Sequence, residues 1–239
     1  MFKKTALCAL AAVSFTAAAA DADETAIRQA FQAKFPKMTV ESVSRTPFAG
    51  IFEVVVSGDV FYTDAKVSYL FSGNLVDVRS GQPKSLTQET TAKLTAGALT
   101  KATDLAVKRV RGNGKRVIYT FEDPNCGYCK ELQKELVKLN DVTIYTFLWP
   151  ILSPDSVEKS KVIWCSRDRA KAWEDYMIKG IALKGKTDCD TSALERNAML
   201  AQRFNLKGTP AVYIGNGEQV GGYVPAAKLE AVLAGAPAR

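Results

Sequence analysis

The chain has 239 residues, enough for one large domain or two modest ones, and 47% of them are hydrophobic, so it can bury a substantial core. Its net charge is +7, but the basic residues are spread along the chain and do not indicate nucleic-acid binding. Histidine is absent, which excludes Cys-His and Ser-His nucleophile pairs and histidine-based zinc or haem sites.

The first twenty residues are typical of a secretory signal peptide. Lys3 and Lys4 precede an apolar stretch, and a run of small residues ends at Ala20. We expect export with cleavage near Ala20. A membrane anchor is the alternative, but the apolar run is short for a membrane span. No later segment is long and apolar enough to span a membrane, so we expect a soluble mature protein.

Residues 21–84 are predicted to form a small domain made of one helix and an antiparallel meander. The helix is expected at 23–35, where apolar residues recur with helical spacing. Turn residues separate four strand-like runs, at 50–56, 60–63, 66–71 and 74–78. Such a unit buries little surface and leaves open sheet edges, and pairing with a second copy would remedy both.

Residues 85–112 are predicted as a linker helix. Ser85 and Gln88 form a capping box at its start, and basic residues precede Gly112 at its end. The alternative is an ordinary core helix.

Residues 113–239 alternate strand and helix, which indicates a compact α/β domain. Parallel strands at 116–121 and 142–149 are expected on either side of a helix that opens at Cys126. Residues 154–204 have mainly helical patterns. A hairpin is expected around 215–217 and a final helix at 225–233.

The mature chain keeps four cysteines, and two of them, Cys126 and Cys129, lie two residues apart at the end of the first of these strands. A helix N-terminus favours negative charge, so it lowers the pKa of a thiol placed there and populates the attacking thiolate. Cys129, one turn later, points toward the core and can attack a mixed disulfide formed at Cys126. The pattern therefore predicts Cys126 as nucleophile and Cys129 as resolving thiol.

Two other readings of the cysteine pair are weaker. A zinc site would need a second close pair, and the remaining cysteines, Cys165 and Cys189, are 24 positions apart in a chain without histidine. A structural disulfide across two residues closes a very small loop and adds little stability. We therefore expect no metal.

The segment KGTPAVYI places Thr209 and Pro210 directly before a strand. A cis Thr209-Pro210 bond would turn the chain tightly, because cis bonds occur almost only at proline. An ordinary trans proline at the start of a strand is the alternative.

Together, CGYC after an apolar strand and GTPAVY some eighty residues later resemble the thioredoxin superfamily. More closely, the chain resembles the DsbC-type periplasmic disulfide isomerases of the DsbC/DsbG family, over its whole mature length. The resemblance implies a homodimer joined through the N-terminal domains and a C-terminal thioredoxin-like domain with a helical insertion.

The resemblance also assigns roles to residues. It implies that Gly127 and Tyr128, between the active cysteines, and Thr209 and Pro210 hold the substrate chain beside the active-site pair, and that Cys165 and Cys189 form a structural disulfide. It implies a periplasmic enzyme without a bound cofactor. A DsbD-type membrane reductase would keep the pair reduced, and the substrates would be misfolded exported proteins with wrong disulfides.

The chain departs from relatives with other tasks. Thioredoxin-type reductants carry a buried acid six residues before the first cysteine, where this chain has Thr120. A member of the DsbC-type family that this chain resembles has histidine after the second cysteine. This chain has Lys130 there, which is a further candidate for stabilising the thiolate. Glu122 and Asp123 would oppose thiolate formation if they pointed inward, and we expect them to lie in solvent.

These observations favour a thiol–disulfide isomerase with chaperone-like binding of unfolded chains. One alternative is a DsbG-like reductase of oxidised cysteines, although that form usually has proline where this chain has Gly127. A dimeric holdase chaperone and a monomeric oxidase are the others. The separate N-terminal domain disfavours the oxidase.

Overall fold

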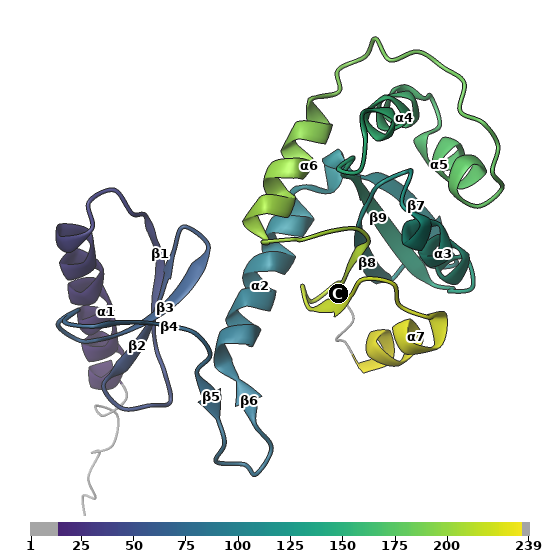
Figure 1. The fold of residues 1–239 in the computed structure, drawn as a ribbon. Coiled ribbons are helices and arrows are strands. Elements are labelled where there is room, and N and C mark those ends of the chain that lie inside the picture. Colours follow the sequence, from purple (N-terminus) through teal and green to yellow (C-terminus); the bar gives the residue numbers. More distant parts are fainter. Residues whose placement is uncertain (1–13, 236–239) are drawn as a thin grey trace, which may run out of the picture. The chain divides into compact units, whose positions relative to one another are not determined.

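A computed structural model of the chain describes residues 14–235 (Figure 1). Its internal contacts divide the chain into two units, Met1–Thr91 and Ala92–Arg239. Most of the expected signal peptide, residues 1–13, lies outside the described residues, and cleavage near Ala20 stays a prediction. In the part of the chain that is described, no helix has both the length and the apolar composition needed to cross a membrane.

The N-terminal unit packs one helix on a four-stranded antiparallel sheet with strand order β1-β2-β3-β4. Its elements are α1 (Ser14–Lys34), β1 (Val40–Arg45), β2 (Ile51–Val56), β3 (Asp59–Asp64) and β4 (Leu70–Ser72). Ile27 and Phe31, one turn apart on α1, are fully buried with Val54 of β2 in the core between helix and sheet. The predicted helix and antiparallel sheet are confirmed.

The chain reverses between β2 and β3 through a two-residue turn at Ser57 and Gly58. Both residues have positive φ, 54° and 90°, as a type I′ hairpin turn requires. Val56 and Asp59 pair directly across the turn. The turn predicted here is confirmed.

Two strands of this sheet differ from the prediction. β1 was not anticipated, because its residues are mostly polar and only two of the six are buried. The run 66–71 forms a strand only from Leu70 onward. Val67 adopts a φ of 53°, and Asp64 Oδ1 accepts the N–H of Ser68 at 2.6 Å, so the residues before Leu70 form a turn.

The run 74–78 was predicted as the last strand of the meander, but it forms part of a separate ribbon. Its strand β5 (Val76–Asp77) pairs with β6 (Lys84–Ser85) instead of with β4. The return strand leads directly into the next helix, α2 (Leu86–Lys101). This helix begins as predicted, with Ser85 Oγ accepting the N–H of Gln88 at 3.2 Å.

The predicted linker helix is too long at its C-terminal end. α2 ends at Lys101, a 3₁₀ turn η1 (Thr103–Leu105) follows, and the next residues form strand β7 (Val107–Arg111). Side chains alternate along β7, with Val107 and Arg109 buried and Lys108 exposed. The basic residues that were interpreted as a helix end therefore occupy both faces of an edge strand.

The C-terminal unit is built on a five-stranded sheet of order β11-β10-β8-β9-β7. Its strands and helices after β7 are β8 (Arg116–Glu122), α3 (Gly127–Leu136), β9 (Val142–Leu148), α4 (Pro154–Cys165), α5 (Arg169–Met177), α6 (Ser192–Arg203), β10 (Ala211–Ile214), β11 (Gln219–Gly221) and α7 (Ala226–Gly235). β8 and β9 are parallel, and the other pairs are antiparallel. The predicted parallel pair, its crossover helix and the β10–β11 hairpin are confirmed.

Successive residues of β8 belong to two different hydrophobic clusters, one on each face of the sheet. Ile118 packs with Leu132 of α3 and Leu229 of α7. Tyr119 and Phe121 pack in the cluster that contains Cys126, Cys129 and residues of α4, α5 and α6. Burial on both faces explains why β8 is a continuous apolar run instead of an alternating one. β8 therefore leads from the middle of the core to the turn that precedes Cys126.

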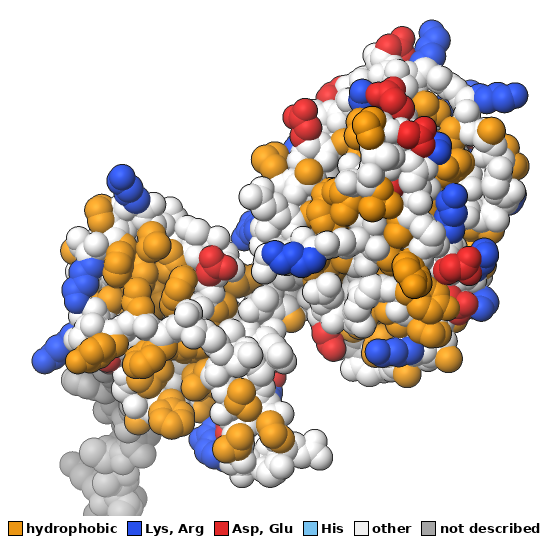
Figure 2. Space-filling model, viewed as in Figure 1, with side chains coloured by type: hydrophobic (Ala, Val, Ile, Leu, Met, Phe, Trp, Pro, Cys, Tyr) orange, Lys and Arg blue, Asp and Glu red, His pale blue; other side chains and the backbone are white. Residues whose placement is uncertain are grey.

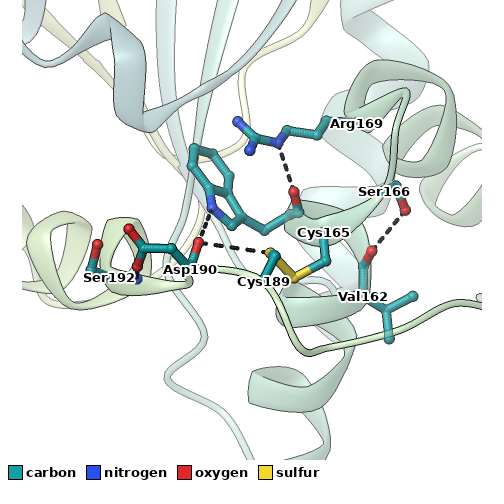
Figure 3. The surroundings of a disulfide bond; sticks show 8 residues. Val162, Cys165, Ser166, Arg169, Cys189, Asp190 and Ser192 are labelled. Carbon is teal, nitrogen blue, oxygen red and sulfur yellow. Dashed lines mark hydrogen bonds between the residues drawn. A yellow bond between two sulfur atoms is a disulfide. The ribbon is translucent and has the colours of Figure 1, made fainter.

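A disulfide joins Cys165, at the end of α4, to Cys189 in the segment before α6, with Cα atoms 5.6 Å apart (Figure 3). This is the pair that the family resemblance implied. Trp164 Nε1 donates a hydrogen bond to Asp190 O at 3.0 Å, and the guanidinium of Arg169 lies 3.5 Å from the Trp164 ring centroid. The disulfide and these contacts fasten the irregular stretch between α5 and α6.

Replacing both Cys165 and Cys189 with serine is expected to lower the free energy of unfolding by about 3.5 kcal/mol. The cysteines are 24 positions apart, and opening a loop of that length returns this much chain entropy to the unfolded state. Equilibrium denaturation in urea measures the loss. The matched control replaces the free cysteines Cys126 and Cys129 with serine and is compared below about pH 6, where the Cys126 thiolate no longer stabilises the fold. An equal loss in both double variants would contradict this account.

Candidate active site

Cys126 caps the N-terminus of α3 with its own sulfur. The chain leaves β8 and turns, with the N–H of Cys126 donating to Asp123 O at 3.0 Å. Cys126 then has extended backbone angles, φ −74° and ψ 117°, and its Sγ accepts the N–H of Cys129 at 3.3 Å. The first turn of a helix has N–H groups without intrahelical partners, so this geometry presents positive dipole ends to the sulfur.

The Thr209–Pro210 loop lies directly against Cys126. The Thr209–Pro210 peptide bond is cis, and Cys126 Sγ lies 3.4 Å from Thr209 O, to which it donates when it is protonated, across 83 residues of sequence. The loop is held there because β10, which starts at Ala211, pairs with β8, with Ala211 opposite Phe121. Sheet pairing thus brings together the two motifs that the sequence singled out.

The two cysteines have opposite ionisation behaviour. The pKa of Cys126 is lowered to about 6 by hydrogen bonds from the Cys129 side chain, from Thr209 and from the N–H groups of Cys129 and Tyr128, and burial opposes this shift. Burial raises the pKa of Cys129, and the charge on Glu122 and the hydrogen bond to Cys126 add to the increase. The pair therefore contains a thiolate at neutral pH and a neighbouring thiol that keeps its proton.

The expectation that Glu122 and Asp123 lie in solvent is wrong, because both residues are fully buried. Glu122 points toward α3, where Gln133 Nε2 donates to its two carboxylate oxygens at 2.7 and 2.9 Å. Burial raises the pKa of Glu122, and the positive charge of Arg109 opposes that shift. The carboxylate can be buried because Gln133 of α3 and Thr146 of β9 supply polar partners for it.

Asp123 ties the active-site loop to the segment after β9. Its Oδ1 accepts the N–H of Asn125 at 2.7 Å, and its Oδ2 accepts the N–H groups of Ile151 and Leu152 at 2.8 and 2.9 Å. Three backbone donors thus replace the water that this carboxylate would otherwise bind. Asp123 therefore fixes the turn from which Cys126 emerges.

Asn125, the residue before Cys126, joins the same turn to α4. Its Nδ2 donates to Asp155 Oδ2 at 2.8 Å and to the hydroxyls of Ser153 and Ser156, and its Oδ1 accepts from Lys159 Nζ at 2.8 Å. These contacts hold the backbone beside Cys126 to the start of α4, while the Thr209 loop contacts the Cys126 sulfur itself. The turn is therefore fastened on both flanks.

The rim of the site contains exposed residues. Gly127 is exposed, Tyr128 is 71% exposed, and Ile151 and Leu152 expose apolar side chains. Lys130 is not directed toward the thiolate, since its Nζ lies 5.1 Å from the centroid of the Tyr176 ring. The hydrogen bonds described above, without Lys130, account for the low pKa of Cys126.

Comparisons with known proteins decide the family. A family model described as a thioredoxin-like domain matches residues 103–236, and one described as a disulfide bond isomerase protein N-terminal domain matches residues 18–88. A probable thiol:disulfide interchange protein DsbC of Bordetella parapertussis is 41% identical over 219 residues, covering 91% of this chain and 77% of the relative. The chain belongs to the DsbC family.

Further relatives agree with this assignment. The thiol:disulfide interchange protein DsbC of Escherichia coli K12 is 30% identical, covering 90% of this chain and 89% of that protein. A crystal structure of a disulfide interchange protein from Neisseria gonorrhoeae is 40% identical with a TM-score of 0.51, covering 56% of this chain and 96% of that one. The chain is thus a thiol–disulfide oxidoreductase with a thioredoxin-like domain.

The polar residues behind the DsbC-family motif were not found by reading the sequence. Arg109 and Glu122 were interpreted as surface charges, and Gln133 was not considered. Two signals pointed to them. Gln133 follows Cys129 by four residues and therefore lies on the same face of the helix. Arg109 lies two residues after Val107 on β7 and therefore shares its buried face.

Alkylation of the reduced protein with iodoacetamide is expected to titrate with a midpoint near pH 6 and to modify Cys126 alone. The reason is that the pKa of Cys126 is about 6, whereas the fully buried Cys129 keeps its proton across the neutral range. Rates measured against pH, with peptide mass spectrometry, give the midpoint and the site. A midpoint near the ordinary value of 9.0 would contradict the assigned geometry.

The same shift sets a pH dependence of stability. Because the folded pKa of Cys126 is depressed, its thiolate stabilises the reduced fold fully above about pH 9, and this stabilisation is lost as the pH falls through about 6. In the native protein, the free energy of unfolding is expected to rise between about pH 6 and pH 9, and the Cys126→Ser variant is expected to lack this rise. An equal rise in the variant would contradict the assigned role of the thiolate.

Proposed function

We propose that this protein is a disulfide isomerase that rearranges incorrect disulfides in exported proteins. The observation that carries the proposal is the asymmetric pair: a low-pKa sulfur at Cys126 beside the cis Thr209-Pro210 loop, with a protonated thiol at Cys129 one turn away. Membership of the DsbC family supports it.

The low pKa of Cys126 suits both halves of isomerisation. With a pKa of about 6, about nine-tenths of the Cys126 sulfur is thiolate at pH 7, ready to attack a substrate disulfide. A thiol of low pKa is also a good leaving group, so a correctly placed substrate thiolate can displace Cys126 and complete the rearrangement. Cys126 returns reduced, and substrate disulfides are exchanged without net oxidation.

Cys129 gives the mixed disulfide a second outcome. When the substrate does not rearrange, the Cys129 sulfur attacks Cys126 and the substrate leaves reduced, which prevents a stalled complex. The enzyme then holds a disulfide between Cys126 and Cys129, and it needs two electrons to return to the dithiol form. We propose a DsbD-type membrane reductase as their source, and the enzyme itself carries no cofactor.

The residues around Cys126 are proposed to hold the substrate chain. Thr209 and Pro210 lie against the sulfur, and Gly127 and Tyr128 form the exposed rim of the site. An extended segment of substrate lying along the Thr209–Pro210 loop would place its disulfide in reach of Cys126. Tyr128, with its large exposed ring, would contact apolar residues that misfolded chains expose.

We propose that the N-terminal unit makes the protein a homodimer and helps bind unfolded chains. Hydrophobic side chains gather on its surface (Figure 2), and the exposed ones include Phe48, Tyr69, Leu70 and Phe71. Within the described residues, β4 is an outer strand of its sheet with β3 as its partner, so its other edge is available for pairing. A lone sheet with such an edge gains stability from a second copy.

A pocket on the same unit fits the binding of unfolded chains. It has a volume of about 260 Å³ and lies between the β1–β2 connection and the β5–β6 ribbon. Its lining is mainly apolar and consists of Pro47, Phe48, Ala49, Leu75, Val76, Asp77, Val78, Arg79 and Leu86. An apolar side chain of an unfolded substrate would fill it. We further propose that the protein works in the periplasm, after removal of its signal peptide.

Refolding of a scrambled multi-disulfide protein tests the proposed activity. Catalytic amounts of the reduced native protein are expected to restore the substrate's activity, whereas the Cys126→Ser variant restores none, because its remaining free thiol, Cys129, is fully buried and protonated. The control is Cys129→Ser, which is expected to retain part of the activity and to accumulate mixed disulfides. No recovery with the native protein would overturn the isomerase proposal, and equal suppression of aggregation by all forms would favour the holdase.

A further inference from the structure

A cluster of buried polar side chains lies directly behind the active-site helix. Arg109 of β7, Glu122 of β8, Gln133 of α3 and Thr146 of β9 are all at most 5% exposed. They come from four elements that are distant in sequence, yet they are joined into one hydrogen-bonded group. Burying an acid and a guanidinium is costly, and hydrophobic residues of similar volume would often serve stability equally well. The cluster therefore calls for an explanation beyond packing.

The geometry connects this cluster to Cys129. Gln133 follows Cys129 by one helical turn on the buried face of α3, and its amide Nε2 donates to both oxygens of Glu122. Cys129 and Glu122 are both fully excluded from solvent. Their charges interact, since the carboxylate of Glu122 contributes to raising the pKa of Cys129. Gln133 thus links a buried carboxylate to the helix face that carries a thiol which water cannot readily reach.

The cation in the cluster is placed so that it does not neutralise the carboxylate directly. Arg109 donates through Nη1 to Gln133 Oε1 and through Nη2 to Thr146 Oγ1 at 2.9 Å, and Thr146 Oγ1 lies 3.5 Å from Glu122 Oε1. One amide and one hydroxyl therefore separate the two charges. A direct bidentate pair would make Glu122 a weak base, whereas this bridged pair balances the buried charge and leaves the carboxylate basic.

We propose that Glu122 accepts the proton of Cys129 when that thiol resolves the mixed disulfide, and that Gln133 and Arg109 position Glu122 for this transfer. The inference rests on the proposed function, because it concerns the resolving step at the same site. Thr120 lies two residues before Glu122 on the same face of β8. Its hydroxyl shares a hydrogen bond of 2.9 Å with that of Thr146 and carries no charge. Glu122 is therefore the acid that faces α3 from this strand.

The step balances as follows. The Cys129 sulfur forms a bond to the Cys126 sulfur while the bond from Cys126 to the substrate sulfur breaks, and its electron pair leaves with the substrate as a thiolate. The Cys129 proton passes to the Glu122 carboxylate. The enzyme pair is oxidised and the substrate cysteine is reduced. When a dithiol donor later reduces the pair, Glu122 returns the proton to Cys129.

The groups that face Glu122 define what the pH dependence can report. They are Arg109 on β7, Gln133 and Cys129 on α3, Cys126 at the N-terminus of α3, and the hydroxyls of Thr120 and Thr146, with Glu174 and Arg111 beyond Arg109. Burial lowers the pKa of Arg109 only to about 10, so it stays charged over the range of the test. Glu122 is then the titrating group that is specific to the second step.

The test is a stopped-flow reaction of the reduced full-length protein with dithionitrobenzoate, which releases a coloured thiolate twice. The first release reports attack by Cys126, and the second reports resolution by Cys129. Glu122→Gln keeps the shape of the side chain and removes the acceptor. We expect the second release to slow by at least about a hundredfold, the lower end of a general-base effect, and the first release not to slow. Glu122→Asp is expected to give an intermediate rate for the second release.

Two controls separate this role from a structural one. Glu131→Gln removes an exposed acid of α3 that pairs with Lys134 and is expected to leave both releases unchanged. Arg109→Met removes the countercharge, so Glu122 holds its proton to higher pH and the pH profile of the second release moves upward, while that of the first release does not move upward from about 6. A merely structural role would slow both releases together.

The outcome is decisive even where a variant folds poorly. A second release in Glu122→Gln within about threefold of the native rate across the pH range would overturn the proposal. If Glu122→Gln does not fold, Glu122→Asp decides: a native rate for its second release overturns the proposal, and a slower one supports it. The readout needs no protein substrate, so failure of the proposed isomerase activity would appear in the refolding assay and leave this test interpretable.

Discussion

The structure of the active site depends on one contact, the hydrogen bond from the N–H of Cys129 to the sulfur of Cys126. It makes Cys126 the N-cap of α3, so its sulfur satisfies one of the N–H groups that have no partner within the helix. The same bond directs Cys129 one turn into the core. A pKa of about 6 at one sulfur and a raised pKa at the other are therefore two results of a single local geometry.

The rest of the domain holds that geometry in place from three sides. Pairing of β10 with β8 brings the carbonyl of Thr209 to the sulfur, Asp123 binds the backbone of the segment after β9, and Asn125 reaches α4. Each anchor binds the loop through backbone or short polar side chains instead of through apolar packing. A site held by directional bonds can stay rigid while its rim remains open to a polypeptide substrate.

Much of this arrangement could be predicted from the sequence, because it follows from local patterns. The strand before Cys126, the helix after it and the turn at Ser57 and Gly58 each have a short-range signal. The buried charges could not be predicted in the same way. Whether Arg109 and Glu122 point inward depends on partners supplied by Gln133 and Thr146 from other elements, and a reading of consecutive residues places them on the surface.

The central claim is that Cys126 alone begins the reaction and Cys129 only resolves it. The most direct measurement mixes the reduced native protein with limiting oxidised glutathione, quenches with acid within the first turnover, and maps the glutathione adduct by mass spectrometry. The account predicts that the adduct lies on Cys126, because this residue is a thiolate and keeps 6% of its surface exposed, whereas Cys129 is fully buried and protonated. An adduct on Cys129, or an equal distribution between the two cysteines, would contradict it.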